Sequence, residues 1–143
     1  MINVIEEWKG AKYHRDTGEL EDWSYMLEVS NLGNIRYSEE YKANTKGLRR
    51  DRPYVGKSGS RHNNYQHFYI TIKGKQLRRR IHRLVMSTFN PLHGNNKKKM
   101  DVDHIDFDQL NNKLYNLRWM EKSAHNKRRR TNCKDYELTK ENN

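Results

Sequence analysis

The sequence predicts an α+β fold in which a small β-rich N-terminal module and a hairpin are followed by a helix and a strand–strand–helix unit. A hairpin is predicted because residues 67–81 alternate apolar and polar side chains on either side of a Lys-Gly-Lys turn. A helix is predicted over residues 82–90, where apolar residues recur at helical spacing before a proline. The last unit is predicted because apolar runs at 102–105 and 117–120 flank a polar loop and precede a basic helical segment.

The N-terminal region is predicted to contain short strands joined by a tight turn. Asn31-Leu32-Gly33-Asn34 supplies residues that tolerate positive φ, so it is expected to be the turn. Trp8, Trp23 and Leu27 are expected in the core rather than on a contact surface. Residues 37–66 spread basic side chains among Gly, Ser and Asn, which indicates either a solvated loop or a segment that orders against nucleic acid.

The composition is that of a basic protein with few aliphatic residues. The chain has 143 residues, enough for one domain or two small ones, and carries a formal net charge of +11. The small share of Leu, Ile, Val and Phe suggests disorder, but nine Tyr and three Trp can build a core, so a thin core is expected. The charge favours nucleic acid as a partner, with an anionic membrane as the second candidate.

Basic side chains form three clusters in the second half of the chain. Arg78, Arg79 and Arg80 lie on the returning strand of the hairpin, so at least one points to each face. One face could contact nucleic acid, or the charges could protect an edge strand from aggregation. The clusters expected to contact DNA are Arg78, Arg79 and Arg80; Lys97, Lys98 and Lys99; and Lys127, Arg128, Arg129 and Arg130.

Reactive side chains occur in a fixed order in the strand–strand–helix unit. Asp103 and His104 close the first apolar run, Asn116 follows His104 by twelve positions, and His125 follows Asn116 by nine. A lone histidine at a strand end usually has a structural role on the surface or in the core and no catalytic role. The ordered set of four favours a catalytic site instead.

This ordered set resembles the HNH nuclease motif, and especially the branch found in phage and intron-encoded homing endonucleases. The resemblance implies a ββα-metal fold in which two strands and a helix hold one divalent metal ion. It implies that His104 is the general base and that Asp103 and His125 are metal ligands, while Asn116 belongs to the catalytic site and braces its loop. The expected metal is Mg²⁺ or Mn²⁺, with Ni²⁺ or Co²⁺ as alternatives.

Two positions depart from the pattern of that family. Phe107 stands where the family usually has glycine. His125 stands where many phage members have asparagine, and Asn126 is its neighbour, so either residue could be the second ligand. The residues before the hairpin also resemble the small N-terminal module that often precedes HNH domains in phage endonucleases.

The expected function is metal-dependent hydrolysis of phosphodiester bonds in double-stranded DNA, by nicking or by double-strand cleavage, in a homing-type phage endonuclease. The alternative is a DNA-binding protein that keeps the fold without the catalysis, and an RNA-binding accessory protein is a further rival. The expected domains are residues 1–66 (N-terminal module and basic loop), 67–131 (hairpin, helix and nuclease domain) and 132–143 (flexible tail). The oligomeric state, monomer or homodimer, is left open.

The expected location is intracellular, in the cytoplasm, or in the host cytoplasm if a phage encodes the protein. The N-terminus is acidic where a secretory signal would be basic, and no apolar run approaches the length that spans a bilayer. Cys133 is the single cysteine, which excludes an intramolecular disulfide. No membrane partner is therefore expected.

Overall fold

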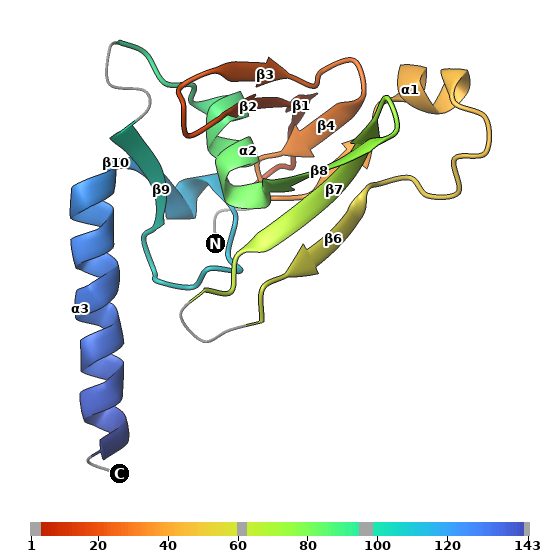
Figure 1. Ribbon diagram of the computed structural model, residues 1–143. Coiled ribbons are helices and arrows are strands. Elements are labelled where there is room, and N and C mark those ends of the chain that lie inside the picture. The colour runs from red at the N-terminus through yellow and green to blue at the C-terminus, as the bar shows by residue number, and fades with distance from the viewer. Residues whose placement is uncertain (1–3, 60–62, 95–98, 142–143) are drawn as a thin grey trace.

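The computed structural model describes residues 4–59, 63–94 and 99–141, with side chains through residue 132, and it has the expected α+β fold (Figure 1). The strands are β1 (Trp8–Gly10), β2 (Lys12–His14), β3 (Leu20–Asp22), β4 (Leu27–Ser30), β5 (Ile35–Tyr37), β6 (Tyr54–Lys57), β7 (Gln66–Ile72), β8 (Lys75–Arg80), β9 (Met100–His104) and β10 (Leu117–Glu121). The helices are α1 (Glu39–Asn44), α2 (Ile81–Phe89) and α3 (Lys122–Glu141). Within the described residues, no helix is long and apolar enough to cross a membrane.

The N-terminal module consists of a three-stranded antiparallel sheet in the order β1-β4-β5 and of a separate hairpin, β2–β3. The predicted turn joins β4 to β5, and Gly33 adopts the positive φ of +85° that it requires. Trp23 and Leu27 are buried, as predicted. Trp8 is only half-buried, so its predicted place in the core is wrong; the Arg36 guanidinium covers its ring at 3.9 Å.

Within the described residues of segment 37–66, a helix and a strand form, so the interpretation as a solvated loop is wrong for these two parts. Helix α1 begins after Ser38, whose hydroxyl accepts a hydrogen bond from the Tyr41 amide at 3.1 Å. Strand β6 joins the hairpin as a third strand, with Tyr54 opposite Tyr69. This pairing joins residues that are distant in the sequence, which is why local composition did not reveal it.

The predicted hairpin is β7–β8, and the predicted helix is α2, which begins one residue earlier than expected. Residues 81–87 of α2 are all buried. Figure 1 shows α2 at the centre of the molecule, and it contacts β1, β2, β4, β7, β8, β9 and β10. The buried Arg83 of α2 donates to the carbonyl oxygens of His14 and Met100. This side chain therefore ties β2 and β9 to the central helix.

Strands β9 and β10 pair antiparallel, with Asp103 opposite Arg118, and α3 follows β10 directly. The two strands and the helix are those that the sequence predicts. The helix continues to Glu141, although a flexible tail was expected over residues 132–143. Its C-terminal half projects away from the rest of the molecule (Figure 1). A projecting helix needs no apolar stripe, so hydrophobic periodicity could not reveal it.

Candidate active site

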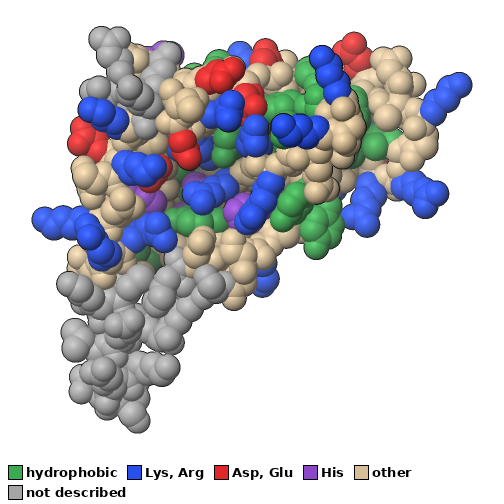
Figure 2. Space-filling model, in the orientation of Figure 1, with side chains coloured by type: hydrophobic (Ala, Val, Ile, Leu, Met, Phe, Trp, Pro, Cys, Tyr) green, Lys and Arg blue, Asp and Glu red, His purple; other side chains and the backbone are tan. Residues whose placement is uncertain are grey.

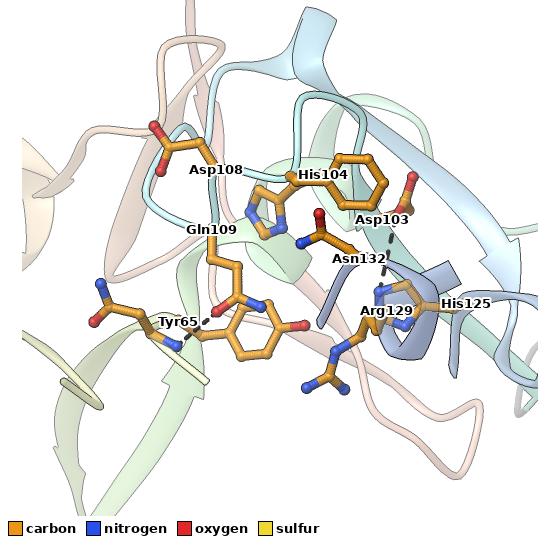
Figure 3. Close-up of a pocket in the computed structure, with 10 residues that line it drawn as sticks. Tyr65, Asp103, His104, Asp108, Gln109, His125, Arg129 and Asn132 are labelled. Carbon is orange, nitrogen blue, oxygen red and sulfur yellow. Dashed lines mark hydrogen bonds and ion pairs between the residues drawn. The ribbon is translucent and has the colours of Figure 1, made fainter. Parts of the chain in front are cut away.

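A cavity of about 180 Å³ lies between the end of β9, the loop that follows it, helix α3 and the segment before β7 (Figure 3). Three of the four motif residues meet there, Asp103 and His104 from β9 and His125 from α3. The lining residues are Asn64, Tyr65, Asp103, His104, Phe107, Asp108, Gln109, His125, Arg129 and Asn132.

The two oxygens of the Asp103 carboxylate face different partners. Oδ2 accepts a hydrogen bond from Nε of Arg118 at 3.0 Å and lies 3.5 Å from Nε of Arg128. Oδ1 faces Nε2 of His125 at 3.9 Å. The arginines stabilise the charged carboxylate, while the oxygen on the side of His125 remains a candidate donor to a ligand.

His125 is oriented by a second carboxylate, that of Asp101. Nδ1 of His125 lies 3.2 Å from Oδ2 of Asp101, and the hydrogen bond from His125 holds the pKa of Asp101 below its usual range. A proton on Nδ1 leaves the lone pair of Nε2 directed toward Asp103. Sequence reasoning missed Asp101, although side chains two residues apart on a strand point to the same face.

The donor set at the cavity fits a divalent metal ion. Asp103 and His125 are 2% and 5% exposed, and they present an oxygen and a nitrogen toward each other. The part of the chain that the structure describes contains no group of three or more His, Cys, Asp or Glu residues able to hold a metal. Mg²⁺ commonly takes only one or two carboxylates from the protein, while waters and substrate phosphates complete its coordination. Asn126 is exposed, whereas the neighbouring His125 is buried beside Asp103.

The His104 imidazole is buried and held through one ring nitrogen. Nε2 lies 2.8 Å from Oδ1 of Asn112, and Nδ2 of Asn112 donates to Oε1 of Gln66 at 2.8 Å. An acceptor at Nε2 places the proton there and leaves Nδ1 unprotonated. Burial lowers the pKa of His104, and the hydrogen bond with Asn112 offsets this in part. The ring is therefore neutral at neutral pH, as a general base must be.

Two aromatic rings that the motif does not contain pack against His104. Tyr65 stacks on His82 at 4.8 Å between ring centroids, and the His104 ring lies 5.7 Å from Tyr65 and 5.0 Å from His82. His82 comes from the start of α2, so the central helix is in direct contact with His104. Nothing local in the sequence marks Tyr65, because it lies in an irregular segment before β7.

The Asn116 side chain forms three hydrogen bonds within the loop after β9. The Asn116 side chain donates to the Asn111 carbonyl and to Oδ1 of Asp106, both at 2.9 Å, and accepts from the Asp106 amide at 3.1 Å. Phe107 adopts a φ of +64°, a left-handed conformation that glycine tolerates better. The guanidinium of Arg128 covers its ring at 3.7 Å.

The basic side chains expected to contact DNA divide into inward and outward groups. Arg79 forms a two-bond ion pair with Glu21, at 2.7 and 2.9 Å, while Arg78 and Arg80 are exposed. Arg128 points inward to Asp103. Lys99, Lys127 and Arg130 are exposed, Arg129 lines the cavity, and Lys97 and Lys98 lie outside the described residues. Figure 2 shows Lys and Arg side chains across one face of the molecule, with histidines between them.

Comparisons with known proteins agree with this geometry. Residues 79–127, from the end of β8 to the start of α3, match the HNH endonuclease family. A solved structure described as "DNA binding and cleavage by the HNH homing endonuclease I-HmuI" matches with a TM-score of 0.59 and 20% sequence identity. The match covers 94% of this chain and 66% of that chain, so this chain spans just under two thirds of its length. No curated protein matches the sequence. Residues 79–127 thus match the HNH endonuclease family, and the chain has a fold similar to that of the solved HNH homing endonuclease structure.

Proposed function

We propose that this protein is a metal-dependent endonuclease that hydrolyses phosphodiester bonds of double-stranded DNA. The observation that carries the proposal is the placement of a neutral histidine beside two potential metal donors in one cavity. His104 keeps Nδ1 unprotonated, while Asp103 and His125 present an oxygen and a nitrogen 3.9 Å apart.

The residues of the cavity divide the chemistry between them. His104 would accept a proton from the attacking water at Nδ1. Oδ1 of Asp103 and Nε2 of His125 would hold a divalent cation, which supplies charge neutralisation at the phosphate when bound. Arg129 lines the same cavity and would approach a phosphate oxygen. Asn116 braces the loop that positions His104 and does not bind the metal.

The exposed basic side chains support DNA as the substrate. A net charge of +11 attracts a polyanion, and phosphate contacts supply most of the sequence-independent affinity for DNA. The proposed contact set contains Arg78, Arg80, Lys99, Lys127 and Arg130, which are exposed. Likeness to a homing endonuclease supports a homing-type role. One cavity cuts one strand, so a monomer would nick the duplex and a dimer could cut both strands.

A plasmid assay tests the proposal. Supercoiled plasmid with Mg²⁺ or Mn²⁺ should become open-circular or linear, and a chelator should stop the reaction. His104→Ala should cleave at least about 100-fold more slowly, because a general base contributes roughly that much or more. Its DNA affinity should persist, because the base acts in the transition state. Cleavage by His104→Ala at the wild-type rate would exclude His104 as the base. Sequencing of the cut ends produced by the wild-type protein would define the product.

A DNA-binding protein without catalysis is the second candidate. One observation favours it: two arginines already neutralise the charge of Asp103, through Oδ2. In that case the wild-type protein would bind DNA and leave the plasmid supercoiled with every divalent metal tested.

A further inference from the structure

A short chain of hydrogen bonds connects His104 to a strand outside the ββα unit. Asn112 lies between them, almost fully buried, with its carbonyl oxygen toward Nε2 of His104 and its amide nitrogen toward Oε1 of Gln66. Gln66 is the first residue of β7, 46 positions before Asn112. The primary amide of asparagine can present either its oxygen or its nitrogen to a neighbour. The hydrogen-bond partner of Asn112 on the side away from His104, which is Gln66, therefore decides whether the amide oxygen or the amide nitrogen faces His104.

The segment that carries Asn112 is in turn held against the N-terminal module. The amide of Leu114 donates to the carbonyl oxygen of Asn31 at 2.8 Å. Gly33 lies so close that a Cβ built there would be 2.9 Å from the Asn112 carbonyl oxygen and 3.0 Å from its Cβ. Glycine is required here both by its φ of +85° and by this close approach. The turn between β4 and β5 is thus packed directly against the residue that holds His104.

We propose that Asn112 is a positioning residue that fixes the tautomer of His104, that Gln66 fixes the orientation of Asn112, and that the Gly33 turn holds the Asn112 backbone. The N-terminal module is then part of the catalytic apparatus as well as a neighbouring unit. A reversed Asn112 amide would offer a donor to Nε2, which would have to become an acceptor. The ring proton would move to Nδ1, and the nitrogen assigned to proton transfer would be lost.

The tautomer can be measured on the metal-free protein without DNA. The ¹⁵N chemical shifts of the imidazole separate a protonated from an unprotonated ring nitrogen, and His104→Gln identifies the signals. The wild-type protein should show a protonated Nε2 and an unprotonated Nδ1. Asn112→Asp keeps the acceptor and should keep this pattern, whereas Asn112→Leu removes it and should give a mixture of tautomers. An unchanged pattern in Asn112→Leu, in a folded protein, overturns the proposal.

Gln66 offers a matched pair of variants that differ in hydrogen-bond direction. Glutamate at this position can only accept, so Gln66→Glu should leave the Asn112 amide as it is. Lysine can only donate, so Gln66→Lys should reverse the amide and shift the His104 proton toward Nδ1. Equal tautomer populations in the two variants would show that Gln66 does not orient Asn112.

The kinetic readout rests on the proposed endonuclease activity and separates positioning from folding. Asn112→Leu should lower kcat for plasmid nicking by about 2-fold or more, because only the fraction of His104 with an unprotonated Nδ1 can act as the base, while KM stays near the wild-type value. Asn112→Asp should recover most of that loss. Loss in both variants, with an unchanged tautomer, would mean that Asn112 has only a structural role.

Gly33→Ala tests the contribution of the N-terminal turn, with Gly74→Ala as its control. Both glycines have positive φ, +85° and +76°, so alanine strains the two turns alike. Only Gly33 has Asn112 within 4 Å, and a Cβ at Gly74 meets nothing. Both variants should lose stability from the strained φ, and Gly33→Ala should lose more because its Cβ also meets Asn112, but only Gly33→Ala should lower kcat and disturb the His104 shifts. Equal effects would overturn the role of the turn.

The ¹⁵N tautomer measurement and the cleavage assay test the positioning role and the proposed function separately. If the wild-type protein does not cut DNA, the proposed function fails, and the ¹⁵N measurement still decides whether Asn112 sets the tautomer. If the wild-type protein cuts and every variant keeps the wild-type tautomer and kcat, the positioning role fails and the proposed function stands.

Discussion

The hairpin arginines allow a test of DNA binding in which the control lies between the two tested residues. Arg78 and Arg80 are exposed on one face of β8, whereas Arg79 is on the other face, paired through two hydrogen bonds with Glu21. Replacing Arg78 and Arg80 together by Gln should weaken binding to every DNA sequence. Arg79→Gln should leave the salt dependence of binding unchanged.

The expected magnitude follows from the number of phosphate contacts. Each contact contributes about 0.9 to the slope of log K against log[salt], so losing two should flatten the slope by about 1.8. When salt is raised from 50 to 200 mM, the fold-loss of affinity in the double variant should therefore be about 12 times smaller than the fold-loss in the wild-type protein. Fluorescence anisotropy with a labelled duplex, repeated at several salt concentrations, measures both slopes.

Arg79→Gln should reveal its effect in a stability measurement instead. Its ion pair with Glu21 is largely shielded from solvent, with both side chains 17% exposed. Hydrogen bonds between charged groups contribute about 1.5–3 kcal/mol, so the free energy of unfolding in urea should fall by about 2 kcal/mol. If the salt slope changes in Arg79→Gln and remains unchanged in the double variant, the assignment of the two faces is wrong.

Three further predictions concern the metal, the pH dependence and the core. His125→Ala should lose nearly all cleavage activity with Mg²⁺ or Mn²⁺ while Asn126→Ala remains active, and the reverse result would move the ligand by one residue. Burial and two neighbouring arginines lower the pKa of His67 from 6.5 to about 4, so the unfolded state binds the proton more readily. The stability contributed by neutral His67 should thus be present above pH 6.5 and decline toward pH 4, by at most about 1.4 kcal/mol per pH unit, and urea titrations should show a flatter profile in His67→Gln. Ser87→Ala should lower the free energy of unfolding by about 1–3 kcal/mol in a thermal melt, because the buried amide of His14 loses its acceptor; an unchanged melting temperature would contradict this.

The sequence by itself determined the elements whose signals are local. Alternation and a Lys-Gly-Lys turn identified β7 and β8, and helical spacing before a proline identified α2. The order and spacing of Asp103, His104, Asn116 and His125 identified the resemblance to the HNH motif. All four residues lie within one contiguous strand–loop–strand–helix unit, so their spacing can be read directly from the sequence. Each of these signals is contained in a few turns or strands of contiguous sequence.

The tertiary structure alone decided which side chains meet across segments. It paired Asp101 with His125, placed Tyr65 and His82 against His104, and joined Gln66 to Asn112. Such contacts depend on how β7, α2 and α3 pack together, and composition or spacing within one segment carries no information about that packing. A charged side chain likewise shows its role only through its neighbours. Alternation along β8 places Arg79 on the face opposite Arg78 and Arg80, but only the position of Glu21 shows that this face is the inward one, where the fold brings opposite charges together.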